Sequence, residues 1–143
     1  MASTVIVHQL AGTKKALEAC RLIEALYLAG KRTVVWVNDA GRAAVLDDML
    51  WTFSQSSFIP HELWDGAGEA SDQVVLVTGT LANPNGADVL VVVDSLAQPE
   101  TAKEFREIHD LVAQAAEDAS KAAGWEAAGF KVKQVQGVSR RGR

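Results

Sequence analysis

Short apolar runs alternate with longer amphipathic segments along most of the chain. Runs rich in Val and Ile predict buried strands, because strands covered on both faces lack the polar alternation of half-exposed ones. Residues 4–8, 33–37, 73–78 and 88–93 have this character. Residues 130–135 instead alternate apolar and polar side chains, which predicts a half-exposed edge strand.

Apolar residues recur at helical spacing between these strands. We expect helices at 14–29, 40–51, 99–105 and 113–128. Gly30 fits the end of the first helix, and Asp39 fits the cap of the second. Residues 106–112 fit either a continued helix or a strand. The repeated order of strand and helix predicts a Rossmann-like three-layer α/β sandwich, with a mostly parallel central sheet and helices on both faces.

Length and composition are those of one globular domain. The chain has 143 residues, of which 48% are hydrophobic and 22% charged. We expect a single domain over residues 1–137 and a basic, disordered tail over 138–143. The net charge of −4 argues against an electrostatic nucleic-acid binder. With no basic leader and no apolar run long enough to cross a bilayer, we expect a soluble, cytoplasmic protein.

Signals for nucleotide binding, metal binding and catalysis are absent from the sequence. The chain has neither a P-loop nor a dinucleotide fingerprint, and the glycine-rich stretch 65–69 carries acids that would repel phosphate. Its single cysteine, Cys20, forms neither a disulfide nor a cysteine metal cage and fits a small core residue. We therefore expect no cofactor and no bound metal.

The remaining polar residues form no recognised catalytic or metal-binding constellation. His8, His61 and His109 lack partners at the usual ligand spacing, and no serine lies in a nucleophile elbow. Asp47, Asp48 and Asp110 lie on amphipathic segments, where we expect solvated carboxylates. The sequence predicts no catalytic residues and no enzyme.

Residues 50–63 concentrate large apolar side chains just beyond the second predicted helix. One interpretation is a loop whose rings fold back onto the sheet. The other is an exposed patch in which Trp51 and Phe58 serve as anchors for a partner protein. Pro60 would fix the backbone of such a patch and lower the entropy cost of binding.

Three segments resemble the chi subunit of bacterial DNA polymerase III, a part of the clamp-loader complex. The most specific is Leu-Trp at 50–51 followed by Ser-Phe-Ile-Pro-His at 57–61. The others are the helix and strand over 19–37 and the helix ending in Ala-Gly-Phe at 128–130. The likeness keeps the same order over nearly the whole chain, and the family's strand before its last helix favours a strand over 106–112.

The resemblance implies a non-catalytic adaptor that binds no nucleotide. Chi subunits bind the psi subunit, which tethers them to the clamp loader, and the Trp and Phe of the specific motif lie at the psi-facing surface in that family. The psi-binding residues that this implies here are Trp51, Phe53, Phe58, Ile59, Pro60 and His61.

Chi subunits also bind the acidic, Phe-ending tail of the single-stranded-DNA-binding protein, and so contact DNA only indirectly. The family uses basic and aromatic residues of the C-terminal helix for this contact. That helix is mostly alanine here, so the residues implied are Lys121, Trp125 and Lys131, with Lys133. Lys121 and Trp125 equally fit a solvated lysine and a core aromatic.

Two alternatives remain open from the sequence. The first is a nucleotide- or flavin-binding enzyme or regulator on a flavodoxin-like sheet, with its site near residues 9–13 and 38–41. The second is that the patch around Trp51 serves another partner, such as a helicase.

Overall fold

The computed structural model of the chain describes residues 3–10, 15–53, 58–94, 96, 98–112 and 115–136, apart from the side chains of 115–119 and 136. Its elements in chain order are β1 (Thr4–Gln9), α1 (Lys15–Leu28), β2 (Thr33–Val37), α2 (Ala40–Thr52), β3 (His61–Leu63), β4 (Val74–Thr78), β5 (Val89–Val92), the 3-10 helix η1 (Pro99–Glu104), β6 (Glu107–Val112), α3 (Ala115–Ala127) and β7 (Lys131–Gln136).

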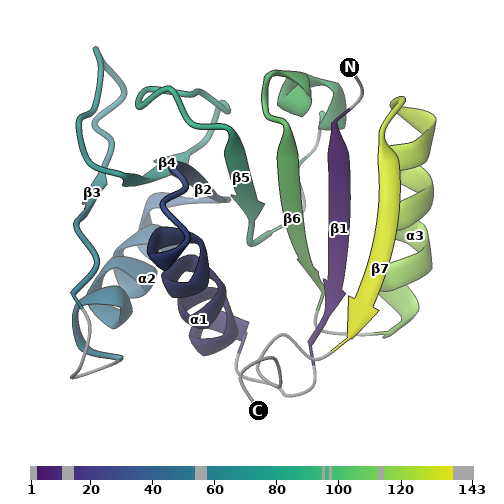
Figure 1. Cartoon of the computed structure of the whole chain (residues 1–143), viewed down its shortest axis with the longest axis horizontal. Coiled ribbons are helices and arrows are strands. Elements are labelled where there is room, and N and C mark those ends of the chain that lie inside the picture. The colour runs from purple at the N-terminus through teal and green to yellow at the C-terminus, as the bar shows by residue number, and fades with distance from the viewer. Residues whose placement is uncertain are drawn as a thin grey trace.

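The strands form one sheet in the order β3-β4-β2-β5-β6-β1-β7, in which all neighbouring strands run parallel. The crossovers through α1 and α2 move in one direction along the sheet, and those through η1 and α3 move in the other. Right-handed crossovers in opposite directions place their helices on opposite faces. Figure 1 shows α1 and α2 together on one side of the sheet and α3 beside β7. The predicted three-layer α/β fold is confirmed.

Two hydrophobic cores fill the spaces between the layers. Val35 and Val37 of β2 join the core under α1 and α2, while Val34 and Trp36 join the core under η1 and α3. Successive side chains of a strand point to opposite faces, so one continuous apolar run supplies both cores. Cys20 lies in the first core, and burial raises the pKa of its thiol to about 12, as fits the predicted core residue.

The predicted helix ends are confirmed by their hydrogen bonds. Gly30 has a φ of +79°, and the next amide, of Lys31, donates to the carbonyl of Leu26 at 3.1 Å, which closes the end of α1. The Asp39 carboxylate accepts the backbone N–H of Arg42 at 2.9 Å and caps α2. Residues 106–112 form a strand, β6, as the family resemblance implied.

The sequence pattern missed β3, the short strand that follows the aromatic-rich stretch. β3 has three residues, and it pairs with β4 through His61 opposite Val74 and Leu63 opposite Leu76. A proline precedes it, and its burial falls from His61 to the exposed Leu63, so it carries neither an apolar run nor a clear alternation. At the other edge of the sheet, β7 is the predicted half-exposed strand and pairs with β1.

No helix in the described ranges has the length and apolar character that spanning a membrane requires.

Candidate functional site

Trp51 and Phe58 form an exposed aromatic pair at the end of α2. Their side chains are 49% and 62% exposed, and their ring centroids lie 5.3 Å apart at an angle of 37°. Trp51 lies in the last turn of α2, and Phe58 begins the described segment that leads into β3. Large exposed rings in contact with each other are typical of protein-docking surfaces.

The residues beside the aromatic pair point into the protein and hold it in place. Ile59 is 1% exposed and lies in the core under α1 and α2, against which Phe53 also packs. Pro60 is half-buried between Ile59 and the start of β3. The implied exposure of Ile59 to a partner is therefore wrong, because consecutive residues of an extended segment alternate between surface and core.

His61 is also buried, and it lies beneath Trp51 instead of beside it on the surface. Its ring centroid is 4.4 Å from that of Trp51, with a 46° angle between the rings. Its Nδ1 is 2.6 Å from the carbonyl oxygen of Ile59, and its Nε2 is 3.1 Å from Oδ1 of Asp47. A direct partner contact through His61 is therefore wrong, but the ring supports the underside of an exposed one.

Asp47 is a residue of this site that the sequence analysis placed on a solvated face. It is half-buried and meets His61 from α2. The signal that could have found it is its spacing to Trp51, because residues four apart on a helix share a face.

Two of the residues implied for the acidic tail are already paired within the chain. The Trp125 side chain is 3% exposed, and its indole N–H donates to Oδ2 of Asp110 at 2.8 Å. Lys121 donates to the other oxygen of the same carboxylate at 2.8 Å, with a side chain only 14% exposed. Trp125 is thus the core aromatic of the alternative interpretation, and Lys121 is a half-buried ion-pair partner instead of a solvated lysine.

Asp110, which was expected on a solvated face, is the centre of this buried cluster. Burial raises the pKa of its carboxyl, and the Lys121 ammonium and the Trp125 N–H partly oppose that rise. The cluster joins β6 to α3 and is a structural feature of the second core.

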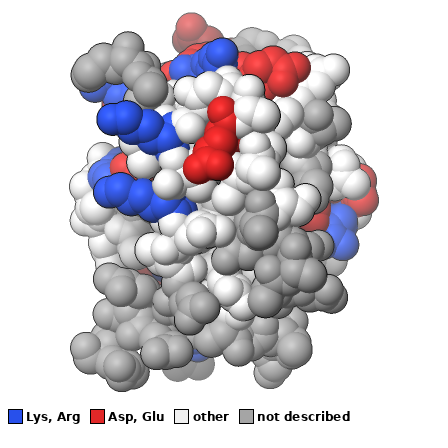
Figure 2. Space-filling model, turned by 90° about the vertical axis from the view of Figure 1, so that its right-hand side faces the viewer, with Lys and Arg blue, Asp and Glu red and all other residues white. Residues whose placement is uncertain are grey.

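Lys131 remains available on the exposed edge of the sheet. It begins β7, and both Lys131 and Lys133 are exposed. Figure 2 shows this side of the molecule, where Lys and Arg side chains gather toward one margin with acidic side chains beside them. Lys131 is therefore the one exposed residue of the three named for an acidic partner, which are Lys121, Trp125 and Lys131.

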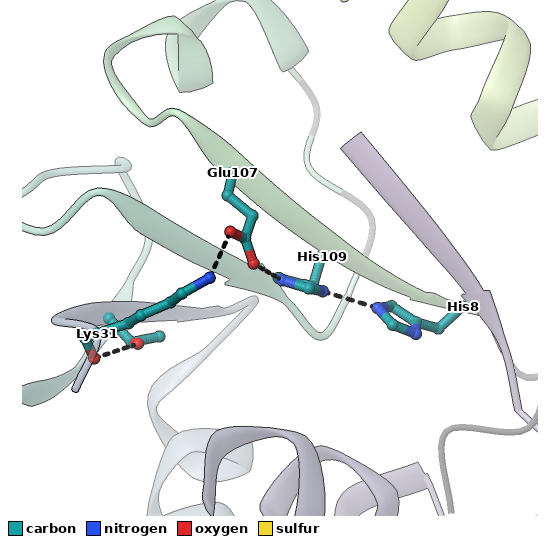
Figure 3. Close-up of polar contacts among 5 residues, drawn as sticks. His8, Lys31, Glu107 and His109 are labelled. Carbon is teal, nitrogen blue, oxygen red and sulfur yellow. Dashed lines mark hydrogen bonds and ion pairs between the residues drawn. The ribbon is translucent and has the colours of Figure 1, made fainter. Parts of the chain in front are cut away.

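A polar chain missed by the sequence analysis crosses the sheet from Lys31 to His8 (Figure 3). The Lys31 ammonium lies 2.9 Å from Oε1 of Glu107, whose other oxygen contacts Nε2 of His109. The remaining nitrogen of His109, Nδ1, lies 2.7 Å from Nε2 of His8. Lys31 and His8 lie 76 and 101 residues from their partners in the chain, so no local motif could reveal this contact.

The charge of Glu107 fixes the first hydrogen bond among these residues. The hydrogen bond from His109 lowers the pKa of the Glu107 carboxyl to about 2, against the opposing effect of burial, and Lys31 lowers it further. Ionised Glu107 accepts from His109 Nε2–H, and His109 Nδ1 shares a proton with His8 Nε2. These contacts from Lys31 to His8 tie β1 and β6 to the turn before β2.

A cavity beside residues 38–41 of the predicted nucleotide site is small and mostly apolar. It measures about 210 Å³ at the carboxyl ends of β2 and β5, where Val37, Leu46 and Val93 line it. Arg42 at its rim is paired with Asp94 at 2.9 Å, and Asp39 already occupies the start of α2. Those contacts leave no phosphate cradle at residues 38–41, and residues 11–13 of the second predicted segment lie outside the described part of the chain.

Within the described ranges, no group of three or more His, Cys, Asp or Glu side chains is arranged to hold a metal ion.

Two curated relatives share partial sequence similarity with the chain. The "Probable DNA polymerase III subunit chi" of Rickettsia prowazekii (strain Madrid E) is 36% identical over 74 residues, which cover 51% of this chain and 44% of the relative. The "DNA polymerase III subunit chi" of Pseudomonas aeruginosa (strain PAO1) is 28% identical over 96 residues, or 67% of this chain and 65% of the relative. The matches thus span about half to two thirds of the relatives' lengths.

Solved structures share the fold at low sequence identity. Saccharomyces cerevisiae Dbp5 bound to RNA and ADP BeF3 superposes with a TM-score of 0.67 at 12% identity, over 94% of this chain and 41% of that one. Domain 2 of the DEAD-box helicase Mss116p, bound to an RNA duplex, gives a TM-score of 0.65 at 10% identity, over 95% and 64% of the two chains. At this identity the likeness concerns the α/β fold alone.

The family assignment comes from a match that covers nearly the whole chain. Residues 3–129 match the family described as "DNA polymerase III chi subunit, HolC". This range contains the aromatic pair and its supporting residues, and the two curated relatives carry the same family name. The chain belongs to the DNA polymerase III chi subunit family.

Proposed function

We propose that this protein is a non-catalytic adaptor subunit of the replicative DNA polymerase, which binds the psi subunit of the clamp loader through the aromatic pair. Family membership supports a role in replication, since the chi family is that of a polymerase accessory subunit and not of the catalytic chain. The proposal places the protein in the cytoplasm with the rest of the polymerase.

The observation that carries the proposal is the exposure of Trp51 and Phe58 on a rigid support. The two rings are about half exposed or more, while Ile59 and His61, which follow them in the chain, are buried. A partner that covers the rings would remove apolar surface from water, and the buried residues beneath the rings already hold them in place. This combination favours a preformed docking surface over a loop that folds back onto the sheet.

A second contact, with the acidic tail of the single-stranded-DNA-binding protein, completes the proposed adaptor. Lys131 and Lys133 support it, because they are exposed on the same face of an edge strand and have the charge that attracts an acidic peptide. Lys121 and Trp125 take no part in the proposed contact.

The test is a binding measurement with Phe58→Ala and a matched control. Phe58→Ala should weaken psi binding by about 2 kcal/mol, or about 30-fold in Kd, as expected for an interfacial aromatic anchor. Leu28→Ala removes an even more exposed side chain, 69% exposed at the end of α1, and should leave the Kd unchanged. Wild-type affinity in the Phe58→Ala variant, or equal losses in both variants, would remove the aromatic pair from the interface.

A further inference from the structure

His61 has a hydrogen-bond acceptor at each of its two ring nitrogens. Nδ1 is 2.6 Å from the carbonyl oxygen of Ile59. Nε2 is 3.1 Å from the Asp47 carboxylate and 3.3 Å from the Asp47 carbonyl oxygen. A carbonyl oxygen only accepts, as does an ionised carboxylate, so the ring has to donate on both sides.

We propose that His61 is held as an imidazolium in the folded protein and that this buried cation is the positioning residue for Trp51. A neutral imidazole has one N–H, and either tautomer would turn a bare nitrogen lone pair toward an oxygen of Ile59 or Asp47. The doubly protonated ring satisfies both contacts and pairs its charge with the carboxylate.

The proton belongs to the ring and not to Asp47. A free aspartic acid is far more acidic than a free imidazolium, so a proton shared between the two rests on the imidazole. The Asp47 side chain is also 23% exposed, which lets water stabilise its charge, whereas the His61 side chain is fully enclosed. Burial by itself disfavours the charged ring, and the hydrogen bonds to Ile59 and Asp47 together with the charge of the carboxylate oppose that cost.

The other charges near His61 do not oppose a positive ring. On α2 they are Asp47 and Asp48, and on β3 the charged residue is Glu62, whose carboxylate accepts the backbone N–H of Asp72. β4, which pairs with β3, carries no charged residue. Of these elements only α2 carries a cation, Arg42, which lies five residues before Asp47 and is paired with Asp94 at 2.9 Å.

The charge on His61 affects the exposed surface through its contact with the Trp51 ring. Its ring centroid lies 4.4 Å from that of His61, within the range of a cation–π contact, and its indole is 49% exposed. The charged ring attracts the electron-rich indole face from below and holds Trp51 against Phe58. Loss of the proton would remove this attraction and leave one of the two oxygens facing a bare nitrogen.

The first test needs no partner protein. Nitrogen-15 NMR of the histidine rings in the isolated wild-type protein should show both nitrogens of His61 protonated at neutral pH. The Asp47→Asn variant removes the carboxylate and should return the ring to a single-proton form at the same pH. A wild-type His61 with one unprotonated nitrogen at neutral pH would overturn the proposal.

The second test measures how docking depends on pH, and this arm alone rests on the proposed function. Loss of the ring proton at alkaline pH should weaken binding to the psi subunit about tenfold. His61→Gln, which cannot carry the charge, should bind at the weaker level with no such pH dependence. Glu62→Gln is the matched control and should keep the wild-type profile.

The two tests separate the two claims. A protonated His61 by NMR together with no psi binding at any pH would contradict the proposed function and leave the imidazolium in place. Psi binding that is tight and independent of pH would instead overturn the positioning role of His61.

Discussion

Adjacent residues Phe58 and Ile59 should have opposite effects on stability and on docking. Ile59→Ala removes three carbons from a side chain that is 1% exposed. At about 0.8 kcal/mol for each buried methylene, the transfer loss is about 2.4 kcal/mol. The cavity left behind adds to this, because the neighbouring helices and strands relax only in part, so we expect a total loss of about 3 to 4 kcal/mol.

Phe58→Ala should cost much less stability, because 62% of that side chain is already in water. The burial that remains is mainly its contact with Trp51, and we expect a loss of less than about 1 kcal/mol. Urea unfolding of both variants, with m-values equal to wild type, gives the two free energies of unfolding directly.

The matching docking measurement reverses the order of the two variants. Ile59→Ala, kept at a temperature where it is folded, should bind psi almost as well as wild type, while Phe58→Ala should not. If Phe58→Ala destabilises the fold as much as Ile59→Ala does, the ring is part of the core in solution and the docking argument is wrong.

Two further predictions concern the buried charges. Asp110→Ala should lower the free energy of unfolding by about 3 kcal/mol, because it leaves Lys121 and the Trp125 N–H without their shared acceptor. Asp110→Asn, which still accepts from Trp125, should cost less in the same urea assay, and equal stability of both variants with wild type would contradict the cluster. For Glu107 the folded pKa of about 2 lies below the ordinary value of 4.5 for a glutamate, so its stabilising contribution is complete above about pH 5 and is lost as the pH falls toward 2. We expect a loss of about 2 kcal/mol across that window by urea unfolding, and a Glu107→Gln variant with the same acid dependence would show that another carboxyl is responsible.

Much of the fold follows from the sequence because its strands are covered on both faces. Continuous Val-rich runs mark such strands without reference to any partner, and Gly30 and Asp39 mark helix ends through local hydrogen bonds. β3 could not be predicted in this way, because an edge strand of three residues is recognised only by its pairing with β4. The order of strands in the sheet is likewise a tertiary property that no local pattern contains.

The exposed aromatic pair was predictable as a patch but not residue by residue. Aromatic residues beyond a helix indicate a patch, yet which of them face outward depends on the register of the segment that carries them. That register places Phe58 outside and Ile59 inside, and it puts His61 beneath Trp51. For Trp125 the sequence fitted either a surface contact or a core aromatic, because the carboxylate that accepts its N–H comes from β6, 15 residues earlier in the chain.

The position of the aromatic pair fits the proposed adaptor role. In open parallel sheets, ligands enter at the carboxyl ends of the strands, but here Asp39 and Asp94 occupy the polar groups beside the cavity at the ends of β2 and β5. The large exposed rings lie instead beside the edge strand β3, where a buried histidine and the core below hold them. The proposed partner at that edge would meet rings that the buried residues beneath already support, so less of the binding free energy would be spent on ordering them.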